Sequence, residues 1–379
     1  MKRNIIIILF LCLFINNLVS AQNSNPVVDT VHVNQREGTF LVDIKYVVHD
    51  FESDPLIVYI QVSNDGGNTF TVPINTLSGD YGFNISPGPD TLHLTWDAGQ
   101  DFPEQYGQNF QVKLFASDLD LGNIASIAAG NFFMGDSSGL FDQQPRHNVT
   151  LNDYFISPYA VTNAEYKIFC DMTGRLYPSE GGISQPPEGY FVNYPEYPVV
   201  GISWYDAVRY CNWLSEKQGY TVCYDTTNWS YDPAMNGYHL PTEAQWERSA
   251  RGNLEKKKYP WGDEDPGTRC NYQSYQGILE GEMANFSNNR GTLPGGKFQP
   301  NGLMLYDMAG NVLEWCNDWY QEDYYVSSPS ENPLGPDSGF EKVIRGGAWN
   351  RSETYLECAF RDKKSPTTKR YDVGFRIAR

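Results

Sequence analysis

The chain has 379 residues, of which 15% are aromatic and 20% are charged, and its formal net charge is −18. The aromatic content and the low charged fraction indicate a folded chain with a sizeable core, and the length predicts two or three domains. Because long-range repulsion opposes anionic partners, the charge argues against binding to nucleic acid or to acidic lipid surfaces.

The first residues have the features of an export signal. Lys2 and Arg3 precede an apolar run over residues 5–18, and residues 19–21 are of the kind that a signal peptidase reads. Two asparagines interrupt the run, which is shorter than the ~20 residues of a membrane span. We therefore expect a signal peptide at 1–21, no membrane span after its cleavage, and a secreted, periplasmic or cell-surface protein.

The next hundred residues have the pattern of short strands. Apolar and polar side chains alternate with a period of two, and turn-forming residues separate the alternating runs. The alternation covers residues 40–48, 92–96 and 110–116, and the turn signals cover 64–68 and 86–90. No helical period appears in this part of the chain. We expect a β-sandwich of immunoglobulin or fibronectin type III character at 23–118 and a linker at 119–124.

Three capped helices are predicted beyond the linker, in a second domain that covers 125–379. Each begins at a Ser or Thr whose hydroxyl can accept a bond from an orphan backbone N–H, and each ends at a glycine. The caps are Thr162, Ser203 and Thr242, and the glycines are Gly174, Gly219 and Gly252. The segments between these helices are rich in Gly, Pro, Asn, Trp and Tyr, which indicates irregular backbone.

Six of the seven cysteines lie beyond the export signal, where disulfides can form. They are Cys170, Cys211, Cys223, Cys270, Cys316 and Cys358. No pair has the CxxC spacing of a zinc or redox site. The spacing leaves both buried thiols and structural bridges open.

Eight motifs, in order, resemble those of the formylglycine-generating enzyme or sulfatase-modifying factor family. They are GNFFMGD (130–136), HNVTLNDYFISPYAVTNAEYKIF (147–169), GISWYDAVRYCNWLS (201–215), HLPTEAQWERSARG (239–252), YPWGDE (259–264), LYDMAGNVLEW (305–315), RGGAW (345–349) and GFRIAR (374–379). The resemblance implies a C-type-lectin-like α+β domain with little regular secondary structure. It also implies, for the oxidising members, conversion of a sulfatase cysteine to formylglycine with copper and dioxygen.

The copper chemistry requires two cysteines after the Gly-Gly motif, because Cu(I) prefers soft sulfur ligands. The positions that the resemblance gives for this pair hold Arg351 and Leu356. Counting back from Cys358 instead places the second thiol at Glu353. Neither alignment supplies a pair, so copper is not expected, and Cys358 is a weak catalytic candidate.

The resemblance also implies a structural calcium ion at the turn before residue 315. Its ligands would be the side chains of Asp307 and Glu314 and the main-chain oxygens of Gly310 and Val312. Calcium takes several oxygen ligands in a flexible shell, which suits this spacing. Met304 stands where the family has a glycine, and turn capping by the two acidic residues is the alternative.

Two functions follow from these observations. The first is an exported, non-oxidising binding or accessory protein, whose partner is an exported protein, peptide or glycan. The alternative is an oxidoreductase that acts on a sulfatase cysteine, or a related peptide oxidation with metal ligands that the motifs do not reveal.

Overall fold

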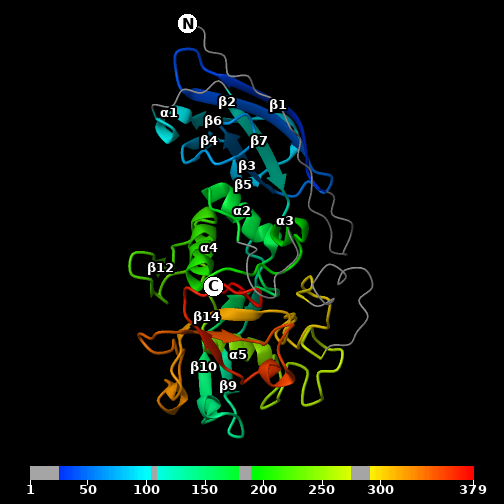
Figure 1. The fold of residues 1–379 in the computed structure, drawn as a ribbon, viewed down its shortest axis with the longest axis vertical. Coiled ribbons are helices and arrows are strands. Elements are labelled where there is room, and N and C mark those ends of the chain that lie inside the picture. Colours follow the sequence, from blue (N-terminus) through cyan, green and yellow to red (C-terminus); the bar gives the residue numbers. More distant parts are fainter. Residues whose placement is uncertain (1–24, 104–108, 179–188, 275–290) are drawn as a thin grey trace. The chain divides into compact units, whose positions relative to one another are not determined.

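The computed structural model describes residues 25–103, 109–178, 189–274 and 291–379. The expected signal peptide lies outside the described residues. The chain divides into two compact units (Figure 1). One comprises Met1–Asp120 with Lys167–Tyr177, and the other comprises Leu121–Tyr166 with Pro178–Arg379.

The first unit contains two antiparallel sheets. One has the strand order β1-β2-β6-β4 and the other β5-β3-β7. The strands are β1 (Val27–Gln35), β2 (Leu41–His49), β3 (Leu56–Ser63), β4 (Leu77–Gly79), β5 (Gly82–Ile85), β6 (Gly88–Asp97) and β7 (Gln111–Ser117). Buried side chains from both sheets, such as Ile44, Val58 and Trp96, form a single cluster. The assignment to an immunoglobulin or fibronectin type III type stays a prediction.

The three predicted strands are confirmed as β2, β6 and β7, and buried side chains alternate along β2 and at the end of β6, whereas Val112 is the one buried residue of β7. In β2 the side chains at even positions from Val42 to Val48 are buried, as a period of two requires. Two details differ from the prediction. The turn signal at 86–90 overlaps β6, which begins at Gly88. A single turn of helix, α1 (Ala98–Asp101), was not predicted because four residues are too few to show a helical period.

The part of the chain beyond residue 120 has short strands, four α-helices and three 3-10 turns among its described residues, and α2 from Lys167 onward is grouped with the first unit. Its largest sheet has the order β16-β15-β14-β17, and the pairs β9–β10, β8–β11 and β12–β13 accompany it. The strands are β8 (Ala125–Ile127), β9 (Gly130–Met134), β10 (His147–Leu151), β11 (Tyr154–Ile156), β12 (Tyr224–Asp225), β13 (Ser230–Tyr231), β14 (Leu313–Trp319), β15 (Lys342–Arg345), β16 (Asp362–Lys364) and β17 (Val373–Gly374). The helices and turns are α2 (Asn163–Thr173), α3 (Tyr190–Asn193), α4 (Trp204–Lys217), α5 (Glu243–Arg251), η1 (Phe141–Gln143), η3 (Tyr324–Val326) and η4 (Glu353–Leu356).

The three predicted helices are confirmed as α2, α4 and α5, and each has its predicted cap. The hydroxyls of Thr162, Ser203 and Thr242 each accept a bond from the backbone N–H three residues later. In each case a side-chain oxygen of that later residue accepts a bond from the backbone N–H of the cap. Orphan donors at the helix starts are thereby satisfied.

Helix α5 lies at the centre of the second unit. It packs against β14 and β15 and also against β9 and β10. Its Trp246 is fully buried in the main cluster of this unit, together with Val149, Met308 and Val343. The helix therefore connects the large sheet to the β9–β10 hairpin. Its buried glutamates place negative charge in the core.

We expect residues 125–379 to unfold cooperatively when they are expressed alone, because their cluster around Trp246 gives them an apolar core of their own. Far-UV circular dichroism during urea titration measures this. An aggregated or molten fragment would show that the strand unit, with which Lys167–Tyr177 is grouped, belongs to the same core.

Candidate functional site

The candidate site is the loop over residues 345–362, which connects β15 to β16. Gly346 and Gly347 both have positive φ, at 96° and 72°. A Cβ atom at Gly347 would lie 2.8 Å from the main-chain oxygen of Tyr355. Glycine is needed here because other residues disfavour this backbone region and would also clash with the returning loop.

The turn over residues 307–311 holds this loop by main-chain bonds. The Gly310 N–H donates to the oxygen of Gly346 over 2.7 Å, and the Trp349 N–H donates to the oxygen of Asn311 over 3.0 Å. The two segments thus form one rigid piece of backbone. It contains both the copper-loop positions and the expected calcium turn.

Arg345 holds the loop from its buried side. Its side chain is fully buried and donates to the main-chain oxygens of Cys358, at 3.0 Å, and Phe360. The same guanidinium pairs with the carboxylate of Glu247 on α5. One arginine therefore holds the returning end of the loop and anchors it to the helix.

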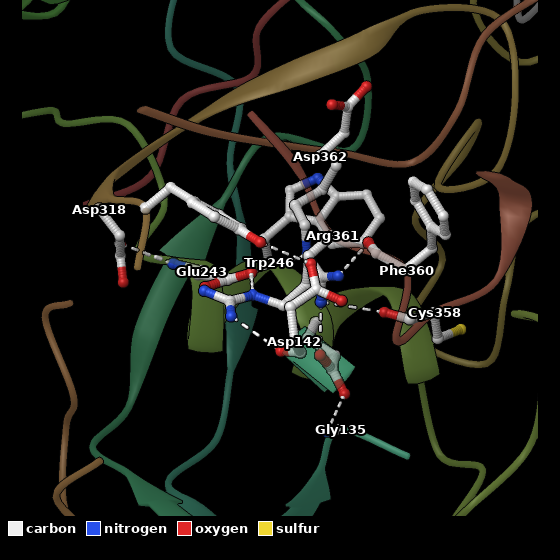
Figure 2. Close-up of polar contacts among 12 residues, drawn as sticks. Gly135, Asp142, Glu243, Trp246, Asp318, Cys358, Phe360, Arg361 and Asp362 are labelled. Carbon is white, nitrogen blue, oxygen red and sulfur yellow. Dashed lines mark hydrogen bonds and ion pairs between the residues drawn. The ribbon is translucent and has the colours of Figure 1, made fainter. Parts of the chain in front are cut away.

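Arg361 makes a second connection to α5, one helical turn earlier (Figure 2). Its Nε and Nη2 donate to the two oxygens of Glu243 over 2.7 and 2.8 Å. Its Nη1 donates to the main-chain oxygens of Asp142 and Gln321. This two-point geometry satisfies both carboxylate oxygens, which is how a buried ion pair offsets its desolvation.

Charge balance in the network lowers the pKa of Glu247. Burial opposes its ionisation, but the nearby charges of Arg251 and Arg345 outweigh burial and keep the carboxylate ionised. Arg251 donates to Glu247 over 2.7 Å from the next turn of the same helix. Glu247 is therefore a buried carboxylate whose negative charge is compensated by two arginines.

Glu314, one of the expected calcium ligands, forms a third buried ion pair, with Arg376. Arg376 donates to both of its oxygens over 2.7 and 2.8 Å, and the Trp246 indole N–H donates to one of them over 2.7 Å. Glu314 is buried in β14. Its carboxylate already has the partners that a buried negative charge requires.

Asp307, the other expected carboxylate ligand, lies at the edge of the same turn. One of its oxygens accepts a bond from the Gly296 N–H over 2.9 Å. Burial, reinforced by the charge of Glu314, raises the pKa of Asp307 to about 6. The expected ligands Gly310 and Val312 lie between these two carboxylates in sequence. Across the ranges that the structure describes, three or more His, Cys, Asp or Glu side chains nowhere gather as a metal-binding group.

Cys358, the weak catalytic candidate, faces the core. Its side chain is buried, and its main-chain N–H donates to the oxygen of Lys258 over 2.8 Å. Burial raises the pKa of its thiol to about 12. Cys316 is also buried, and burial raises its pKa well above the usual value. All six cysteines within the described residues are buried, and none of them forms a disulfide with another of the six, so the structure favours buried thiols over structural bridges.

The residues at the expected copper positions have other roles. Leu356 is fully buried beside Tyr259 and Cys270. Arg351 is partly exposed, and its Nη2 donates to Asp372 over 3.1 Å. Arg370 donates to both oxygens of the same carboxylate over 2.7 Å. Sequence reasoning missed this arginine pair, because nothing in the motifs indicates that residues 351 and 370 meet.

Sequence reasoning also missed the ionic core beneath the loop. A signal for it existed: α5 has two glutamates four positions apart, with a tryptophan between them. Acidic side chains on the buried face of a helix require cationic partners. The sequence alone does not say which of the chain's arginines supply them.

We predict that Glu247→Gln destabilises the protein by about 3–5 kcal/mol, because it removes the buried carboxylate that the Arg345 and Arg251 guanidinium groups share. Glu264→Gln is the matched control. It removes a carboxylate that is 68% exposed and 4.0 Å from Arg269, which is worth less than about 1 kcal/mol. Guanidinium chloride denaturation compares the two variants. Equal stability of both would show that the ionic core does not hold the loop.

Comparison with known proteins gives a consistent result for the second unit. The model of the family described as "Sulfatase-modifying factor enzyme 1-like domain" matches residues 113–379. The formylglycine-generating enzyme of Streptomyces coelicolor is 31% identical over 296 residues, covering 66% of this chain and 87% of that protein. The chaperone protein LppX of Paenibacillus barcinonensis is 29% identical, covering 67% of this chain and 88% of that protein.

The serine/threonine-protein kinase Pkn1 of Chlamydia trachomatis is 33% identical over 67% of this chain, but the match covers only 37% of the kinase. Among solved structures, Treponema denticola variable protein 1 aligns with a TM-score of 0.55 and 28% identity, covering 70% of this chain and 95% of that one. PvdO from Pseudomonas aeruginosa aligns with a TM-score of 0.53 and 26% identity, covering 68% and 93%.

None of the helices in the described ranges is both long and apolar enough to span a membrane. The family model spans the entire second unit, and its relatives include enzymes and proteins with other names. The eight ordered motifs, the mixed α+β architecture and these matches agree. The chain belongs to the sulfatase-modifying factor family, and its second unit has the C-type-lectin-like α+β fold of that family.

Proposed function

We propose that this chain is an exported, non-oxidising member of its family that binds a protein, peptide or glycan. One observation carries the proposal: within the described residues, the loop over 345–362 contains a single thiol, and that thiol is buried. The proposed export rests on the signal-like residues 1–21, and the proposed location is secreted, periplasmic or at the cell surface.

The chemistry of the loop supports this proposal. A two-coordinate Cu(I) site needs two thiolates, whereas the loop contains one thiol, and that thiol is buried. The alternative positions for a second thiol hold Arg351, Glu353 and Leu356. None of these side chains offers the soft sulfur ligand that a two-coordinate copper site uses.

The printed names of the relatives also support a function other than oxidation. The same domain matches a formylglycine-generating enzyme, a kinase and a chaperone protein. A domain that occurs in proteins with such different names is a scaffold whose surface, rather than its core, is adapted to each function. We place the binding surface on the solvent side of the 345–362 loop.

The second candidate function is the oxidation of a sulfatase cysteine to formylglycine. The 31% identity with the Streptomyces coelicolor enzyme favours it, because the match covers 87% of that enzyme. Cys358 would then need a second sulfur ligand from outside the loop. Cys316 is the buried cysteine in the same hydrophobic cluster, and it is the partner that this alternative requires.

We predict that the purified protein neither binds Cu(I) tightly nor converts a Cys-x-Pro-x-Arg peptide to its formylglycine form. The assay mixes protein, Cu(I), a thiol reductant, dioxygen and peptide, and mass spectrometry reports the peptide product. A copper-dependent formylglycine-generating enzyme is the positive control. Conversion by the wild type that disappears in Cys358→Ser, with Cys223→Ser as the matched thiol control, would establish the oxidoreductase instead.

Calcium binding at the 307–314 turn is a second part of the proposal. The raised pKa of Asp307 supports it, because a half-buried carboxylate with little cationic compensation gains from a bound cation. The ion pair between Glu314 and Arg376 opposes it, because that carboxylate already accepts three bonds. Asp307 and main-chain oxygens are therefore the ligands that fit the turn better.

We expect EGTA to lower the melting temperature of protein that elemental analysis has shown to contain calcium, because a ligand of the native state stabilises it by mass action. At a calcium concentration one hundred times the Kd, this stabilisation is about 2.7 kcal/mol. Asp307→Asn should remove the effect of EGTA, whereas Asp337→Asn, at an exposed position, should retain it. An unchanged melting curve in calcium-loaded wild type rules out a stabilising ion.

A further inference from the structure

The C-terminal segment is basic although the chain as a whole is acidic. Residues 345–379 contain nine Lys and Arg and four Asp and Glu, whereas the chain carries a net charge of −18. Three of these arginines, at 345, 361 and 376, are buried and paired with glutamates. The remaining positive charges therefore lie outside the ionic core.

Two of the remaining arginines converge on one carboxylate. Arg351 donates to Asp372 over 3.1 Å, and Arg370 donates to both of its oxygens over 2.7 Å. The Asp372 side chain is only 3% exposed, whereas those of Arg351 and Arg370 are 21% and 39% exposed. The carboxylate is therefore the buried member of the group, and the two arginine side chains are its partly exposed members.

The charges of this group do not balance. Burial alone would raise the pKa of Asp372, but the bond from Arg370 and the charges of both arginines lower it, so the group stays ionised. Within hydrogen-bonding distance, two permanent positive charges thus face one negative charge, and the charge of Asp362 acts on Arg370 from farther away. The Nε–H of Arg351 is buried and has no acceptor in the part of the chain that the structure describes. Donors and positive charge are both in excess.

The group is also held rigidly. The main-chain oxygens of Arg370, Asp372 and Arg351 accept bonds from Gly201, Leu313 and Gln273 over 2.8, 2.8 and 3.0 Å. The guanidinium of Arg351 lies 5.2 Å from the ring centre of Tyr355, which limits its movement. A ligand would therefore meet two pre-oriented arginines rather than two flexible side chains.

We propose that Arg351 and Arg370 bind a carboxylate of an acidic peptide segment on a partner protein. Planar guanidinium groups bind planar carboxylates through paired N–H bonds, and Asp372 shows that these two arginines accept that geometry. The inference rests on the proposed binding function and deepens it. A peptide is the occupant that we favour over an acidic glycan, because the family is described as modifying a protein.

The test is a fluorescence-anisotropy titration of the purified chain with a labelled peptide of alternating Glu and Ser, and with its Gln and Ser counterpart. We expect binding of the acidic peptide only, and weaker binding as salt is raised. Arg351→Gln and Arg370→Gln should each weaken it about tenfold or more. Arg269→Gln, the matched control at a 47% exposed arginine, should leave it unchanged.

Asp372→Asn separates ligand binding from a structural role. It removes the internal competitor, so the acidic peptide should bind as tightly as to the wild type or more tightly. If the arginines only support the fold, Asp372→Asn should weaken binding as much as the arginine variants do, and this result overturns the inference. Equal binding by Arg351→Gln, Arg370→Gln and Arg269→Gln overturns it as well. Thermal melting of every variant checks folding, and Arg→Lys replaces any Arg→Gln variant that does not fold.

A polyuronate is titrated in parallel. Arginine-dependent binding of polyuronate without binding of the acidic peptide overturns the assignment to a peptide. The conversion assay keeps this inference distinct from the proposed function. Formylglycine production rejects the non-oxidising function whatever the titrations show, whereas no conversion and no peptide binding rejects only the inference about Arg351 and Arg370.

Discussion

The second unit depends on two buried carboxylates, one helical turn apart on α5. Glu243 and Glu247 pair with Arg361 and Arg345, which lie at the two ends of the 345–362 loop. A buried charge without its partner is costly, so neither helix nor loop can move without the other. This constraint holds the Gly-Gly turn and the main-chain bonds to residues 307–311 in place.

The same constraint separates the support of the loop from its surface. The arginines that hold the loop face the core, and so does the thiol of Cys358. Arg351, at an expected copper position, is instead partly exposed and pairs with Asp372. The side chain at position 351 therefore takes no part in the buried ion pairs that hold the loop. This is how a family scaffold can persist in a member that lacks the copper cysteines.

Local signals in the sequence were sufficient for the three principal helices and for strands β2, β6 and β7. Thr162, Ser203 and Thr242 begin α2, α4 and α5 as predicted, because a cap is an interaction between residues three positions apart. Alternation located β2, β6 and β7 for a similar reason, since the side-chain period of a strand is two. The one-turn helix α1 and the start of β6 within a turn signal were missed, because so few residues carry no periodicity.

The sequence by itself determined the family, the positions of the principal helices and the lack of a cysteine pair in the 345–362 loop. These follow from residue identity and short-range spacing. Only the tertiary structure decided which carboxylate each arginine meets, that the Cys358 thiol is buried, and that Arg351 and Arg370 share Asp372. These pairings join segments as far apart as Glu243 and Arg361. At such separations the sequence does not distinguish one charged side chain from another as a partner. Only the folded backbone determines which of them lie within bonding distance.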